Sequence, residues 1–130
     1  HCANALAVAK FVQKHPKIAW VNYPGLEGDK YHDLAQKYMP KGTCGVVTFG
    51  VKGGRKAAET FMAGLKLASI ATHVADAKTC VLHPASSTHR QLSEAELAAA
   101  GVSADLIRLS VGIEDITDIL ADLEQALDQV

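Results

Sequence analysis

The sequence has 130 residues, of which 48% are hydrophobic and 21% charged, and its formal net charge is −1. This length and apolar fraction predict one folded domain and exclude ordinary disorder. The 13 basic side chains are balanced by 14 acidic ones, so the basic footprint typical of nucleic-acid binding is missing. No apolar stretch approaches the roughly 18 residues that a membrane span needs. We therefore expect neither a nucleic-acid nor a membrane partner.

The first residues, HCANALAVAKF, lack Met and already follow a helical pattern. The charged segment and the long apolar segment of a signal peptide are both missing there. We therefore expect the sequence to begin inside a longer protein.

Cysteine and histidine occur without the spacing of a disulfide framework or a metal site. Cys2, Cys44 and Cys80 lie far apart with no CxxC pair, and a sparse, odd count favours a reducing compartment. The six histidines form no HxxxH or HExxH pattern, whereas structural zinc needs clustered thiolates or imidazoles. We expect no metal site.

The beginning of the chain predicts a helix followed by a strand. The helix covers residues 4–14 with Asn4 as its N-cap, and Pro16 stops it because the proline ring clashes with a continuing helix. Residues 18–23 are rich in β-branched and aromatic side chains, which favours a strand.

The middle of the chain continues this alternation. A helix over 30–39 precedes a strand over 44–51 and a helix over 55–65, while residues 66–74 are ambiguous. Both helices carry apolar residues at helical spacing: Tyr31, Leu34, Ala35 and Tyr38 in the former, and Ala58, Phe61, Met62 and Leu65 in the latter.

A strand over 79–83 leads into a polar loop and a short helix. Ser93 and Glu96 form a capping-box pattern that opens this helix, and Gly101 ends it.

The last strand and helix of the prediction cover residues 106–111 and 114–127. The strand is apolar except for Arg108 and Ser110, so it is half-buried with these two side chains on one face. The helix places Ile116, Leu120, Leu123 and Leu127 inward.

Helices and strands thus interleave, with four or five strands and no long polar linker. An α/β or α+β sandwich, in which helices cover one face of a small sheet, satisfies this order. The order alone does not decide between parallel and antiparallel pairing.

The residues show no complete catalytic constellation, because neither a GxGxxG, a GxxxxGK nor a GxSxG motif occurs. Two stretches stand out for their chemistry: HPASSTH at 83–89 and RLSVGIED at 108–115. The hydroxyls of the former either cap turns or contact a ligand.

Arg108 lies in the middle of an apolar strand. A guanidinium there costs free energy unless it is paired, and its planar fork fits a carboxylate with two hydrogen bonds. Two interpretations stay open: Arg108 binds a ligand carboxylate, or it forms an internal ion pair with Asp105, Glu114 or Asp115.

Four stretches resemble the C-terminal domain of the Cys/Met-metabolism family of pyridoxal-phosphate (PLP) enzymes: VNYPGL (21–26), GVVTFGVKGG (45–54), THVADAKTCVLHPASSTH (72–89) and LIRLSVGIEDITDILADLEQAL (106–127). The resemblance runs essentially from end to end, and HPASxTH followed by LIRLSVGIED is a specific combination. Within the family, residues 75–97 are most similar to the O-acetylhomoserine sulfhydrylase branch.

The resemblance implies that residues 1–130 are the single C-terminal domain of a fold-type I enzyme, usually a homotetramer. Its expected fold is a mostly antiparallel sheet with helices on one side. In such enzymes PLP and its Schiff-base lysine lie in a larger N-terminal domain whose motifs are missing here. The lysines of this chain are therefore expected at the surface, and the chain alone is expected to be inactive.

The resemblance carries over to few residues. Arg108 matches the arginine that binds the substrate α-carboxylate, and Thr88 matches a threonine near the same group. Thr72 and His73 fall where cystathionine-branch enzymes have a Glu-Ser pair lining the side-chain pocket. This chain departs from the family pattern there, so these two positions are weaker candidates for substrate binding.

The implied function is a cytoplasmic, PLP-dependent enzyme that makes homocysteine or methionine from O-acetylhomoserine and sulfide or a thiol. One alternative is another enzyme of the family, a methionine γ-lyase or a cystathionine γ-lyase or synthase. A second alternative, of another class, is a binding or oligomerisation module without catalysis of its own.

Overall fold

Two central strands decide how the layers of the fold pack. In the computed structural model, which describes residues 1–130, β2 (Val46–Val51) and β5 (Leu106–Ser110) run antiparallel with Thr48 opposite Arg108. Successive side chains along a strand point to opposite faces of the sheet. One face of the two strands is therefore fully buried, and its side chains are Val47, Phe49, Ile107 and Leu109.

The complete sheet has five strands in the order β1-β2-β5-β4-β3. β1 (Ile18–Asn22) pairs with β2, and β4 (Cys80–Leu82) pairs with β5, both antiparallel. Only the short β3 (Ser69–Ile70) runs parallel to its neighbour β4. The mostly antiparallel sheet expected from the resemblance is confirmed, and the ambiguous residues 66–74 contribute its edge strand.

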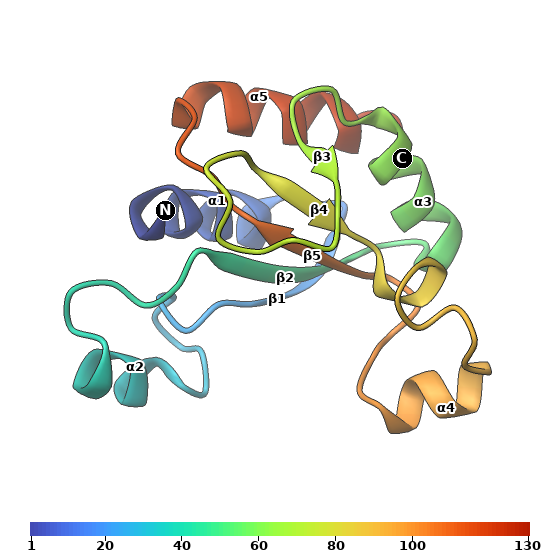
Figure 1. Ribbon diagram of the computed structural model, residues 1–130, viewed down its shortest axis with the longest axis horizontal. Helices are drawn as coiled ribbons and strands as arrows, with labels where there is room; N and C mark the ends of the chain where they lie inside the picture. Colours follow the sequence, from blue (N-terminus) through green and yellow to red (C-terminus); the bar gives the residue numbers. More distant parts are fainter.

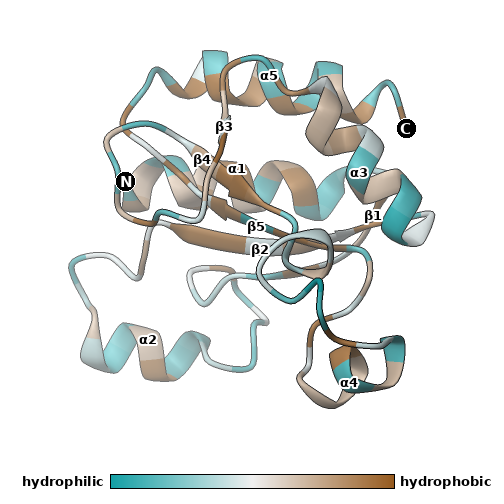
Figure 2. Ribbon diagram, turned by 45° about the vertical axis from the view of Figure 1, so that its right-hand side comes forward, coloured by the Kyte–Doolittle hydropathy of each residue, from teal (hydrophilic) through white to brown (hydrophobic).

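Three helices cover one face of this sheet (Figure 1). They are α1 (Cys2–Lys14), α3 (Gly54–Gly64) and α5 (Ile116–Leu127). Their apolar sides turn toward the brown, hydrophobic strands β2 and β5 in Figure 2. The ring of Phe61 on α3 meets that of Phe49 edge-on, with centroids 5.8 Å apart, an arrangement favoured by the ring quadrupoles. None of the helices is long and apolar enough to cross a membrane.

The opposite side of the sheet carries only small helical elements: α2 (His32–Tyr38), the 3₁₀ turn η1 (Pro84–Ser86) and α4 (Glu94–Ala99). Figure 1 shows α2 and α4 below the sheet, well separated from each other. We call the uncovered sheet surface that carries Thr48 and Arg108 the open face.

The apolar spacing in α2 does not become a buried face. Of its four apolar positions only Ala35 is buried, whereas Tyr31, Leu34 and Tyr38 are 54%, 52% and 70% exposed. Helical spacing shows that these side chains share one side, but the rest of the chain covers only Ala35 on it.

Helix termini agree with the sequence analysis at α4 and differ at α1. The Ser93 and Glu96 capping box is present, and Gly101 follows α4 with a φ of 72°, as expected for a helix end. The N-cap of α1 is His1, not Asn4. Asn4 lies inside the helix, and its Nδ2 donates to the carbonyls of Gly112 at 3.1 Å and Glu114 at 2.9 Å. This amide therefore ties α1 to the turn after β5.

A buried carboxylate connects α5 to the chain between α3 and β3. Asp122 is 7% exposed, and its oxygens accept hydrogen bonds from the backbone N–H groups of Lys66, Leu67 and Ala68 at 2.8, 2.9 and 3.0 Å. Buried backbone donors need such partners, because a donor left without one loses its hydration uncompensated.

We predict that Asp122→Ala lowers the free energy of unfolding by about 2 to 4 kcal/mol, because three backbone donors lose their acceptor. Asp118→Ala is the matched control, since Asp118 is exposed on the same helix, and its effect should stay within about 0.5 kcal/mol. Urea unfolding followed by circular dichroism measures both. Equal losses in the two variants would contradict this role of Asp122.

Candidate functional site

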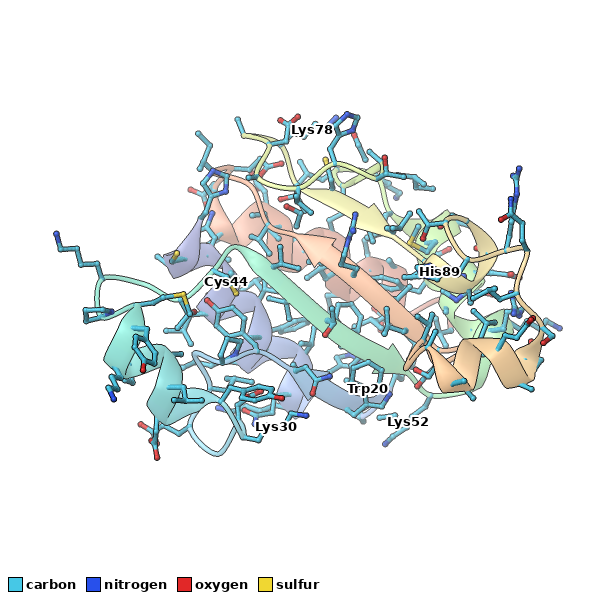
Figure 3. All side chains as sticks on the ribbon, turned by 60° about the horizontal axis from the view of Figure 1, so that its bottom comes forward. Trp20, Lys30, Cys44, Lys52, Lys78 and His89 are labelled. Atoms are coloured by element: carbon cyan, nitrogen blue, oxygen red, sulfur yellow. The ribbon has the colours of Figure 1, made fainter.

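The candidate site is built around Arg108 in the centre of the open face. Arg108 stands opposite Thr48 on β2 and opposite Leu82 on β4. Trp20 lies on the same face, across Gly50 of β2, and Figure 3 looks directly onto this surface. The sheet thus holds the guanidinium on its middle strand, where neighbouring strands fix the backbone on both sides.

A loop between β3 and β4, residues 71–78, crosses beside this arginine. The Nη2 group of Arg108 donates to the carbonyl of Thr72 at 2.7 Å. The backbone N–H of Ala75 donates to the Ser110 Oγ at 3.0 Å, and the N–H of Ile113 donates to the carbonyl of Ala77 at 2.8 Å. We call residues 71–78 the strap. Its side chains from Thr72 onward are exposed.

The internal ion pair that the sequence left open is not formed. Arg55 forms an ion pair with Glu94, and the ring of His15 lies 3.8 Å from the Glu124 carboxylate. The Nε of Arg108 is buried and has no hydrogen-bond partner. The guanidinium therefore has one backbone carbonyl as its partner and no compensating negative charge within the chain, a costly arrangement for a permanent cation.

The three acidic candidates are each engaged elsewhere. Asp105 accepts from the indole N–H of Trp20 at 2.9 Å. Glu114 binds the backbone N–H and the hydroxyl of the buried Thr79. Asp115 caps α5, where its carboxylate accepts from the N–H of Thr117 at 2.8 Å. These contacts leave Arg108 available to a carboxylate from outside the chain.

The other candidate residues occupy different positions relative to Arg108. Thr72 contacts Arg108 through its carbonyl and not through its hydroxyl. His73 follows on the exposed strap and forms no hydrogen bond through its ring. Thr88 is exposed, and its hydroxyl lies 2.9 Å from the Nδ1 of His89. The structure thus brings Thr72 to the arginine, and no hydrogen bond joins His73 or Thr88 to it.

The HPASSTH loop uses several of its polar groups to stabilise its own turn. His83 is 2% exposed, and its ring nitrogens lie 2.8 Å from the Ser86 Oγ and 2.8 Å from the Ala104 carbonyl. The Ser87 hydroxyl donates to the His83 carbonyl at 2.6 Å. These bonds support the turn-capping interpretation for the two serines.

The thiol nearest to the site is a weak nucleophile at neutral pH. Cys80 faces the same surface, opposite Ser110, and burial raises the pKa of its thiol, with Asp76 and Glu114 raising it further. A thiol whose pKa is raised carries little of the reactive thiolate at neutral pH.

The lysines of the chain lie mostly at the surface. Lys17 donates through its Nζ to the Leu127 carbonyl at 2.8 Å, and all other lysines are exposed. In Figure 3, Lys52 and Lys78 lie at the rim of the molecule.

No three His, Cys, Asp or Glu side chains are grouped to hold a metal ion. The chemistry that this surface offers is recognition of an anion by one arginine.

A known protein family shares this sequence over almost its whole length. Residues 1–128 match the family described as Cys/Met metabolism PLP-dependent enzyme. The chain is a member of this family, which confirms the resemblance seen in its sequence.

The relatives of the chain include sulfhydrylases and lyases. It is 52% identical to the O-acetyl-L-homoserine sulfhydrylase of Leptospira meyeri and 46% identical to an L-methionine gamma-lyase of Fusobacterium nucleatum, in both cases over 100% of its length. It spans only 30% and 33% of these two proteins.

A solved structure shows the same fold. With a TM-score of 0.91 and 41% identity, 98% of the chain matches 30% of a candidate O-acetylhomoserine (thiol)-lyase from Campylobacter jejuni, which carries a pyridoxyl-lysine phosphate. The mixed sheet and its helices therefore correspond to 30% of that solved chain.

Proposed function

We propose that this chain provides the substrate-carboxylate site of a cytoplasmic O-acetylhomoserine sulfhydrylase that acts as a homotetramer. The observation that carries the proposal is Arg108, whose guanidinium lies on the open face without an acidic partner. The sulfhydrylases among the relatives, at up to 52% identity, support this branch of the family.

The proposed ligand of Arg108 is the α-carboxylate of O-acetylhomoserine. A planar, permanently charged fork binds a carboxylate with two parallel hydrogen bonds and so fixes its direction as well as its position. Thr88 is proposed to contribute one hydrogen bond near the same group. Thr72 and His73 are proposed to lie near the side chain of the substrate, because they follow one another on the strap beside Arg108.

The proposed reaction replaces the acetate of O-acetylhomoserine by sulfide or a thiol, giving homocysteine or methionine. PLP supplies an electron sink in enzymes of this kind, and we propose that it is bound by the residues that the longer relatives have in addition. The contribution of this chain is orientation: holding the carboxylate turns the reacting carbons toward the cofactor, an effect worth several kcal/mol when the geometry is good.

The first test concerns Arg108 in the full-length enzyme. We expect Arg108→Ala to raise KM for O-acetylhomoserine and to lower kcat/KM by about 30-fold or more, because the substrate carboxylate loses its charged partner. Arg108→Lys keeps the charge but loses the fork, and should recover only part of the loss. Arg90→Ala, at an exposed arginine outside the site, is the control. Unchanged kinetics in Arg108→Ala would refute the carboxylate role.

The second test separates the candidate functions. The methionine gamma-lyase relatives, at 46% identity, make elimination the second candidate. The full-length protein should form homocysteine from O-acetylhomoserine plus sulfide faster than it releases α-ketobutyrate without sulfide. The opposite ratio would identify a γ-lyase.

A third test concerns the chain alone. Titration with PLP should give no reducible Schiff base, and a stoichiometric one would contradict the proposal that the cofactor is held elsewhere.

A further inference from the structure

The buried serine next to Arg108 along β5 has a partner that the proposed function does not use. Ser110 lies two residues after Arg108, so both side chains point to the open face. Ser110 is only 2% exposed, and its Oγ accepts the backbone N–H of Ala75 at 3.0 Å. A polar side chain buried on a sheet and bonded to an exposed loop points to a role in holding that loop.

The loop residue that Ser110 holds is in an unfavourable conformation. Ala75 has a φ of 60° and is the only residue other than glycine with a positive φ in the chain. An L-residue adopts this region at a cost, because its Cβ approaches the following carbonyl oxygen. The strap therefore needs a fixed contact at this point to keep its shape.

The same strap orients the arginine. Three residues before Ala75, the Thr72 carbonyl accepts the Arg108 Nη2 at 2.7 Å. At its other end the strap is fixed by Ile113, whose N–H donates to the Ala77 carbonyl. Ser110 thus contacts the strap at Ala75, between its fixed end at Ala77 and the Thr72 carbonyl that contacts the guanidinium.

We propose that Ser110 is a positioning residue for carboxylate binding: through Ala75 it fixes the strap, and the Thr72 carbonyl of the strap directs the Arg108 guanidinium. This inference rests on the proposed function of Arg108. Without the Ser110 hydroxyl the strap relaxes toward ordinary φ values, Nη2 loses its acceptor, and the guanidinium turns away from the geometry that binds a carboxylate.

The test measures binding of two probes to the full-length enzyme by calorimetry. L-Norleucine has an amino-acid carboxylate but no leaving group, and L-norleucinamide replaces that carboxylate by an amide. We expect Ser110→Ala to raise the Kd of norleucine about 3- to 10-fold, as for one lost hydrogen bond, and to leave the Kd of norleucinamide unchanged. Ser103→Ala, at an exposed serine, should change neither.

A second variant tests the route through the strap. Glycine adopts a positive φ without the steric cost of alanine, so adding Ala75→Gly to Ser110→Ala should bring the Kd of norleucine back toward its original value. A Kd that stays high in the double variant would overturn the route through Ala75.

The remaining outcomes distinguish this inference from the proposed function. An unchanged Kd of norleucine in Ser110→Ala, or equal weakening of norleucine and norleucinamide, would overturn the positioning role. If Arg108→Ala itself left the Kd of norleucine unchanged, this result would contradict both the carboxylate role of Arg108 and the positioning role of Ser110.

Discussion

The main constraint on this structure is the guanidinium of Arg108, which has no counter-ion within its own chain. Placing a permanent charge on the middle strand of an apolar sheet costs free energy unless a partner compensates it. The nearby acids could supply that partner, but each is bound elsewhere, to the Trp20 indole, to Thr79 or to the start of α5. We propose that this charge binds a ligand, since the buried Nε has no hydrogen-bond partner within the chain.

The scaffold makes this arrangement rigid. β5 lies between β2 and β4, so the backbone at Arg108 is paired on both sides, and sites on such elements are more accurately placed than sites on loops. Two hydrogen bonds to Gly112 fix the turn after β5. The Asn4 amide of α1 donates to the Gly112 carbonyl, and the Thr79 hydroxyl accepts a hydrogen bond from the Gly112 N–H at 2.9 Å. Residues far apart in sequence thus fix the turn that directly follows the strand carrying the arginine.

Local patterns in the sequence were sufficient for much of the fold. The period-two alternation of β5 placed Arg108 and Ser110 on one face, and the spacing of Ser93 and Glu96 predicted the start of α4. Features that depend on distant partners were not predictable in this way. Asn4 has the residue type of an N-cap, yet its amide bonds to carbonyls over a hundred positions away.

The candidate site shows the same division. Its arginine stood out because a charge interrupts an apolar strand, but the choice between an internal ion pair and a ligand depended on where three acids lie in space. The strap could not be predicted, since β3 has only two residues and pairs with a strand ten residues further on. The bond from Ala75 to Ser110 joins two segments whose contact no sequence period reveals.

The most direct test is a crystal structure of the full-length enzyme with bound L-norleucine. We predict that both carboxylate oxygens lie about 2.7 to 2.9 Å from guanidinium nitrogens of Arg108, with Nη2 still bonded to the Thr72 carbonyl. A structure in which norleucine occupies the enzyme with its carboxylate on other groups, and Arg108 remains without an anion, would contradict it.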